Sequence, residues 1–300
     1  MTWAILHLIA ILLVLPTIFI YSLWKEKFKS KLEWMIHSLS TILIIVWLFL
    51  SGSWDWIGYY LRFIWIILLI IVIIRSWIKT KALPFRIEFN GKQKLTMGIY
   101  IVLLLVFGMY NFFVISSYTT EEKTIELSFP LKNGTYYVGQ GGNHVQMNYH
   151  NAYPSQKYAI DIVKLNRLGT RANGLYPKNI EKYEIFNDEL FSPCYGKVVE
   201  MKDHLPDLTP PDTNPENPEG NYLALSCDGE DAIVYIAHMK KGSVVVEEGS
   251  KVQEGQKIGN VGNSGNTTEP HLHIHAEKDG KGIPILFDGR FLVRNHLVHE

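Results

Sequence analysis

Three histidines alternate along Pro270–Glu277, which reads PHLHIHAE. Alternate residues of a β-strand face the same side, so His271, His273 and His275 would form one row of imidazoles. Imidazole is a common zinc ligand, whereas a row with only a packing role would favour Val or Leu, because buried imidazoles need polar partners. We therefore expect this group to bind a metal or to take part in catalysis.

Further residues with the same chemistry lie upstream. One apolar stretch ends in His238, within YIAH, and another ends in Asp161, within KYAID. His150 comes earlier, in the tripeptide NYH. Two histidines and one carboxylate leave the fourth position of a tetrahedral zinc ion open, and the pKa of a water in that position falls toward 7. These residues predict a catalytic zinc site.

The glycine-rich segment before the histidine row carries a family resemblance. Gly242–His273 reads GSVVVEEGSKVQEGQKIGNVGNSGNTTEPHLH, and YIAH and SPCYGKVVE precede it. Together these motifs resemble the zinc peptidases of the lysostaphin and LytM type, peptidase family M23, over about Gly139 to Ala276. The H-x-H pair behind the glycine-rich run is the most specific part. The resemblance implies a LytM/M23-like β-sheet fold, a Zn²⁺ cofactor and peptidoglycan peptides as substrate.

The resemblance also implies roles for individual residues. His273 and Asp161 would be metal ligands. His238 and His271 would not bind the metal but would orient the water, act as general base or stabilise the developing oxyanion.

Two positions depart from the family pattern. Many members have a histidine ligand four residues before the aspartate, where this chain has Lys157, and an ammonium group cannot bind zinc. His150, eleven residues before Asp161, is the natural substitute, and His144 is a second candidate. His275 stands where many relatives have Glu, and we expect it to support a ligand rather than to bind the metal.

Short segments rich in β-branched and aromatic residues must position these groups. They are Tyr195–Met201, Asn221–Ser226, Ala232–Ala237 and Gly242–Glu247. Gly and Asp separate them and no long helical periodicity competes, so we expect a mainly antiparallel β domain over residues 119–300. Pro206–Gly220 holds five prolines and should form a loop. Cys194 and Cys227 either form a disulfide or stay free, since geometry decides between the two.

The first 118 residues have a different composition. They contain four apolar stretches, at Trp3–Leu23, Trp34–Leu50, Ile57–Ile74 and Leu95–Ile115. Each is near the roughly 20 residues that a helix needs to cross a bilayer. We therefore expect a transmembrane region of four helices over residues 1–118.

The loops between these stretches predict an orientation. The first and third loops are basic, with Lys25, Lys27, Lys29 and Lys31, and with Arg75, Lys79, Lys81, Arg86, Lys92 and Lys94. The second loop, Ser51–Trp56, has no basic residue. Basic loops stay in the cytoplasm, so the C-terminal domain of this multi-pass protein should lie on the extracytoplasmic side of the cell membrane.

These features predict a membrane-anchored, zinc-dependent endopeptidase that acts on cell-wall peptidoglycan peptides. The formal net charge is zero, which excludes the overall basic charge of a nucleic-acid binder. Because Lys157 replaces a usual ligand, an alternative stays open. In it the protein is a catalytically degenerate M23-like scaffold or activator that binds cell wall or other wall hydrolases. A sensor that signals through the four helices is a third interpretation.

Overall fold

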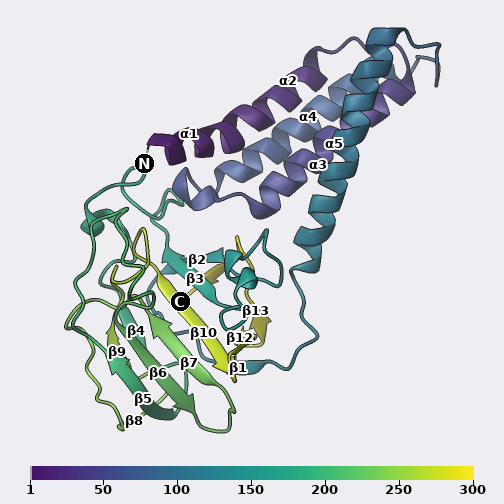
Figure 1. Ribbon diagram of the computed structural model, residues 1–300. Coiled ribbons are helices and arrows are strands. Elements are labelled where there is room, and N and C mark those ends of the chain that lie inside the picture. The colour runs from purple at the N-terminus through teal and green to yellow at the C-terminus, as the bar shows by residue number, and fades with distance from the viewer. Residues whose placement is uncertain (1) are drawn as a thin grey trace. The chain divides into compact units, whose positions relative to one another are not determined.

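The computed structural model describes residues 2–300 and has two compact units (Figure 1). Thr2–Trp54 and Gly58–Ile115 form one unit, called the helical unit below. Asp55–Ile57 and Ser116–Glu300 form the other, called the β domain. The short segment Asp55–Ile57 therefore belongs to the β domain, although helical residues flank it in the sequence.

The helical unit contains four helices that are long and apolar enough to cross a membrane, with 23, 21, 20 and 26 residues. The first, Trp3–Lys25, begins within α1 (Thr2–Ile9) and continues through a π-helical turn (Ala10–Val14) and α2 (Leu15–Lys25). The other three are α3 (Lys31–Ser51), α4 (Leu61–Thr80) and α5 (Gly91–Ser116). Pro16 follows the π-helical turn, as expected where proline lacks an N–H and crowds the preceding turn. The prediction of four apolar helices is confirmed.

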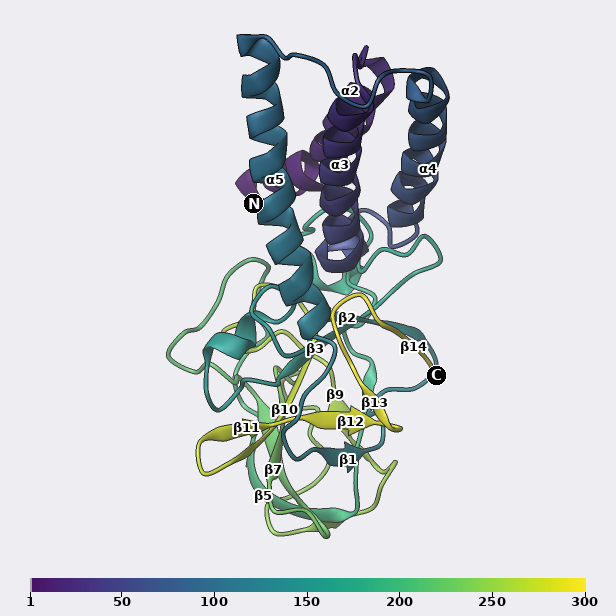
Figure 2. The ribbon, with the colours of Figure 1, turned by 90° about the vertical axis from the view of Figure 1, so that its right-hand side faces the viewer.

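Two side-chain hydrogen bonds, one from α3 and one from α5, join these helices. Figure 2 shows the course of both helices. The Ser40 hydroxyl donates to the Tyr100 carbonyl at 2.7 Å, and the Asn111 amide donates to the Leu43 carbonyl at 2.9 Å. These donors find their acceptors inside the unit, as the hydrogen-bond donors of groups within a bilayer must.

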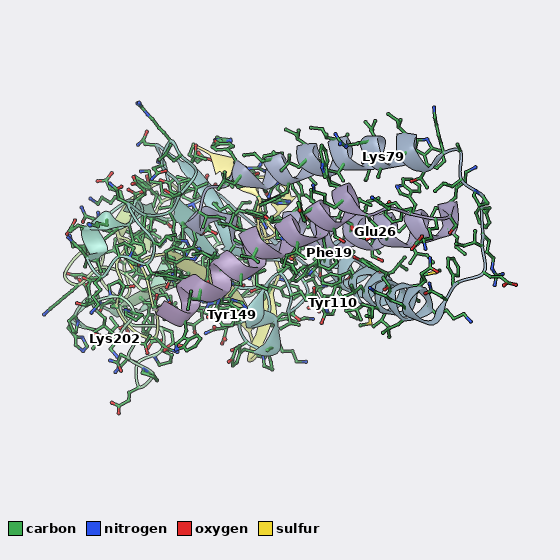
Figure 3. All side chains as sticks on the ribbon, turned by 90° about the horizontal axis from the view of Figure 1, so that it is seen from above. Phe19, Glu26, Lys79, Tyr110, Tyr149 and Lys202 are labelled. Carbon is green, nitrogen blue, oxygen red and sulfur yellow. A yellow bond between two sulfur atoms is a disulfide. The ribbon has the colours of Figure 1, made fainter. Side chains whose placement is uncertain are left out.

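The two basic loops lie at one end of the helical unit. Glu26, just after α2, and Lys79, near the end of α4, point to this shared end (Figure 3). The backbone amides of Lys31 and Leu32 donate to the carbonyls of Pro84 and Phe85, each at 3.0 Å. The loops that carry the basic residues thus contact one another, as a common membrane face requires.

A nine-stranded antiparallel sheet forms the centre of the β domain. Its order is β14 (Leu297–His299), β2 (Thr135–Gln140), β3 (Ile160–Lys164), β10 (Leu272–Lys278), β7 (Ile233–Ala237), β6 (Tyr222–Cys227), β5 (Gly196–Lys202) and β8 (Lys251–Val252), and β11 (Lys281–Ile283) pairs with β10. Two small sheets accompany it. One holds β1 (Ile125–Leu127), β12 (Ile285–Phe287) and β13 (Arg290–Phe291), and the other holds β4 (Glu189–Phe191) and β9 (Lys257–Asn260). The predicted mainly antiparallel fold is confirmed.

Successive side chains of a strand point to opposite sides, which gives the central strands a core face and a polar face. On β10, Leu272, Ile274 and Ala276 are buried in the hydrophobic core, whereas His273 and His275 alternate with them. The neighbouring strands β3 and β7 supply Ile160, Ile162, Val234 and Ile236 to the same core. The core therefore fixes the register that carries the histidines on the opposite face.

One predicted strand is wrong. Gly242–Glu247 forms no strand: two of its backbone amides donate to a side chain, and the amide of Val245 alone is seen to donate to β9, at the Ile258 carbonyl. The amides of Gly242 and Val244 donate to the two carboxylate oxygens of Asp203, at 2.8 and 3.1 Å. Gly242 also has φ +69°, a turn conformation that interrupts extended structure.

The two cysteines form a disulfide, Cys194–Cys227, with a Cα–Cα distance of 5.8 Å. Cys194 lies two residues before the start of β5, and Cys227 is the last residue of β6, opposite Gly196. This settles the choice that the sequence left open.

Candidate metal centre

Strand register places the carboxylate and one histidine opposite each other. In the antiparallel pair β3–β10, Asp161 is the register partner of His273, and both face away from the core. His273 Nδ1 lies 2.9 Å from Asp161 Oδ1. The two residues are 8% and 4% exposed, so their polar atoms meet each other rather than bulk solvent.

A short turn brings the third residue to the same carboxylate. His150 lies in the 3₁₀ turn Tyr149–Ala152, and Asn148 caps this turn by accepting from the His150 amide at 3.2 Å. The Asn148 side chain also donates to the Ala159 carbonyl at 2.9 Å, which fastens the turn beside β3. His150 Nε2 then lies 3.0 and 3.1 Å from the two oxygens of Asp161.

The donor set His150, Asp161 and His273 fits a zinc ion. Their ligand atoms lie within 4.8 Å of one another. A tetrahedral zinc ion with bonds of about 2.0–2.2 Å holds its ligand atoms about 3.3 Å apart, close to the 2.9–3.1 Å seen here. Two imidazoles and one carboxylate also leave a fourth position open for water.

His238 and His271 lie beside this set with their tautomers fixed. His238 Nδ1 is 2.9 Å from the Ser264 carbonyl, and His271 Nδ1 is 2.9 Å from the Glu269 carbonyl. A carbonyl only accepts, so each Nδ1 carries the proton and each Nε2 keeps a lone pair. His271 Nε2 is 3.5 Å from Asp161 Oδ1.

The ring centroids of His238 and His271 are 4.9 Å apart, and the ring centroid of His238 is 5.6 Å from that of His273. These three histidines form a second group with metal-binding geometry, which shares His273 with the first. All five predicted site residues therefore come together.

The loop Pro206–Gly220 supports this side of the site. It has no helix or strand, as predicted, and it packs on the segment before His271. The amide of Leu208 donates to the Asn263 carbonyl at 3.0 Å, and the amide of Asn214 donates to the Gly265 carbonyl at 2.9 Å. At Gly220 a Cβ would lie 2.2 Å from the Ser264 carbonyl oxygen, so this close approach requires glycine.

His275 lies behind His273. Its Nδ1 is 3.0 Å from His273 Nε2, and its ring stacks on Tyr235 with centroids 4.9 Å apart. If His273 binds through Nδ1, its proton must sit on Nε2 and be donated to His275. This hydrogen bond would allow His275 to support His273 as a ligand, as expected.

Burial controls the protonation of the site. Burial would raise the pKa of Asp161, but His150 and His271 outweigh it and hold the pKa well below its usual value. Burial lowers the pKa of His273 to about 4 and that of His238 well below its usual value. The carboxylate is therefore ionised and both of these imidazoles are neutral at neutral pH, as metal binding requires.

The other two candidates stay outside the donor set. Lys157 donates to Glu122 at 2.7 Å in a partly exposed ion pair. His144 Nδ1 accepts from the Gln146 amide at 3.2 Å, and among the described residues 2–300 neither metal-binding group includes His144. Sequence reasoning missed Asn148, although an Asn two residues before the candidate ligand is a common turn cap.

Comparison with known proteins matches residues 186–284 to the model of peptidase family M23. Similar solved structures include a zinc-containing peptidase from Vibrio cholerae, which is 19% identical with a TM-score of 0.30 over 54% of this chain and 39% of that chain. Lysostaphin from Staphylococcus simulans is 18% identical, with a TM-score of 0.27 over 53% of this chain and 47% of that chain. A chain of the SpoIIIAH and SpoIIQ complex is 14% identical, with a TM-score of 0.35 over 52% of this chain and 95% of that chain.

This chain spans less than half the length of the two peptidases. The family match includes His238, His271 and His273, whereas His150 and Asp161 precede it and are assigned by geometry alone. Residues 186–284 of the chain therefore match peptidase family M23.

Proposed function

We propose that this protein is a membrane-anchored, zinc-dependent endopeptidase that cleaves peptides of cell-wall peptidoglycan on the extracytoplasmic side. The observation that carries the proposal is one buried carboxylate, Asp161, between His150 and His273, with His238 and His271 beside them. A role in packing alone does not require five such groups gathered at one site.

His150, Asp161 and His273 would hold the ion. A bound zinc ion supplies Lewis-acid polarisation of a carbonyl and lowers the pKa of water. Side chains of the domain would then transfer the proton from the attacking water to the leaving group. With Nδ1 committed to a backbone carbonyl, His238 or His271 accepts the proton of the attacking water at Nε2. The imidazolium so formed donates that proton to the leaving amine.

Two observations support the extracytoplasmic side. Both basic loops lie at one end of the helical unit, and basic loops face the cytoplasm. An even number of spans then returns the chain to the outside at Ser116. The disulfide Cys194–Cys227 is also typical of an oxidising compartment. Peptidoglycan is a peptide-containing substrate within reach of an enzyme held there.

The test uses the full chain in detergent and in membranes. We expect about one zinc per chain by elemental analysis, and release of peptide fragments from purified peptidoglycan. Asp161→Asn should abolish both. Asp231→Asn is the matched control, because Asp231 sits in an exposed ion pair with Lys278, and it should retain both.

A folded, metal-free wild-type protein that binds peptidoglycan without cleaving it would instead support the scaffold alternative. Labelling with a membrane-impermeant thiol reagent tests the side. Lys197→Cys should react in intact cells and Lys79→Cys should not, and the reverse would overturn the proposed location.

A further inference from the structure

Asp55 is a charged residue enclosed by the β domain. It lies between α3 and α4 in the sequence, but it belongs to the β domain and is 0% exposed. The backbone amide of Arg171 donates to the Asp55 carbonyl at 2.8 Å, and Arg171 Nε donates to Asp55 Oδ2. Two contacts with the same residue, one from backbone and one from side chain, fix the segment in place.

Arg171 uses the rest of its guanidinium to reach a second carboxylate. Its Nη1 donates to Glu269 Oε1 at 3.0 Å, and its guanidinium lies 4.5 Å from the centre of the Trp56 ring. Trp56 in turn stacks on Tyr176 with ring centroids 3.8 Å apart. Burial alone would lower the pKa of Arg171, but Asp55 and Glu269 outweigh it and raise the pKa, so this buried cation stays charged.

Glu269 connects the ion pair to a histidine of the candidate site. Its backbone carbonyl accepts from His271 Nδ1 at 2.9 Å and from the Thr267 hydroxyl at 2.7 Å. The side chain of Glu269 is anchored by Arg171, while its carbonyl holds the tautomer and orientation of His271. A shift of Glu269 would therefore move His271, one of the two histidines that can accept the proton in the proposed reaction.

We propose that Asp55 is a positioning residue for the peptidase site, acting through Arg171 and Glu269 on His271. The segment between two predicted membrane spans thereby completes the site of the β domain. This inference rests on the proposed peptidase function. A guanidinium presents donors in a rigid plane and can bond two carboxylates at once, whereas an ammonium group has no such geometry. Without Asp55, Arg171 is a buried cation with one carboxylate, and it must reorient or take up water.

The first experiment tests the contact without measuring catalysis. A site-specific protease sequence is inserted after Glu121 in the full chain, and Asp55→Cys is combined with Arg171→Cys. After mild oxidation and cleavage, the two fragments should stay joined until a reductant is added. The control pair combines Asp55→Cys with Lys197→Cys, on the exposed side of β5, and its fragments should separate. Separation of the first pair as well would overturn the inference.

The second experiment tests the positioning role by kinetics on peptidoglycan peptides. Asp55→Asn and Arg171→Lys should each lower kcat by about 10–100-fold, the range expected when a reacting group is displaced by about 1 Å. KM should change by less than about twofold and zinc should stay near one per chain, because neither residue contacts substrate or ligands. Glu189→Gln, in the exposed pair with Lys257, is the control and should leave kcat unchanged.

The outcomes separate this inference from the proposed function. If wild type cleaves and Asp55→Asn cleaves equally fast at a temperature where both are folded, the pair is only structural and the inference is wrong. If wild type does not cleave at all, the proposed function fails. The contact itself is then refuted only if positions 55 and 171 also fail to form the cross-link.

Discussion

Truncation of His275 to Ala tests whether the proposed zinc site depends on the hydrogen bond between His275 and His273. His275 is 4% exposed, and burial lowers its pKa well below the usual value, so the ring is neutral. A neutral imidazole keeps one nitrogen as an acceptor, and Nδ1 lies 3.0 Å from His273 Nε2. With a metal on His273 Nδ1, the proton of His273 would sit on Nε2, and His275 Nδ1 would accept it.

The expected loss follows from the role of His275 as a partner of a ligand. Removing such a partner costs about 10–100-fold in metal affinity, or roughly 1.4–2.7 kcal/mol. His275→Asn is the matched variant, because its Oδ1 stands near the position of the imidazole Nδ1 and can still accept from His273. We expect Asn to keep most of the affinity that Ala loses.

The assay is zinc competition against a chromophoric chelator at pH 7.5, with the full chain in detergent. Thermal unfolding of the metal-free variants is recorded beside it, since truncation of a buried ring also costs packing. Wild-type affinity in His275→Ala would refute the reasoning. Equal losses in the Ala and Asn variants would show that packing against Tyr235, rather than the hydrogen bond, supports the site.

Three further predictions follow from the site and the fold. His150→Ala should lose bound zinc while His144→Ala keeps about one per chain by elemental analysis; equal zinc in both would contradict the ligand set. For the metal-free protein, the folded pKa of His273 near 4 lies below the unfolded 6.5, so the unfolded chain binds more protons between these values. Stability should be full above pH 6.5 and fall by ~3 kcal/mol toward pH 4 from this residue alone. Urea unfolding after chelation measures it, and a flat profile across that window would contradict it. Replacing Cys194 and Cys227 together by Ser should cost about 3–4 kcal/mol in denaturant unfolding, because the bond closes a loop with sequence separation 33. Reduced wild type is the control and should match the variant.

The alternation of the sequence predicted the polar face of β10. A strand buried on one side must place every second residue in the core, and Leu272, Ile274 and Ala276 fulfil that requirement. The histidines between them then have only one face to occupy. The same reasoning failed for Gly242–Glu247, because Asp203 accepts from the amides of Gly242 and Val244, and Gly242 turns the chain with φ +69°.

Spacing alone did not determine which histidine reaches Asp161. A position four residues earlier is Lys157, and the geometry turns it toward Glu122 instead. His150 reaches the carboxylate because a capped 3₁₀ turn folds the chain back beside β3. Such a return depends on tertiary hydrogen bonds from Asn148, which leave no periodic pattern in the sequence.

The contact of Asp55 with Arg171 was also beyond sequence reasoning, since 116 positions separate the two residues and neither belongs to a motif. In the sequence, the loop between the second and third apolar helices differs from the other two loops by its lack of basic residues. A single span before Ser116 would be enough to tether the β domain, but it would not supply Asp55. Arg171 would then keep only Glu269 as a charged partner among the contacts described here. The segment between α3 and α4 thus carries the carboxylate on which the proposed positioning of His271 depends.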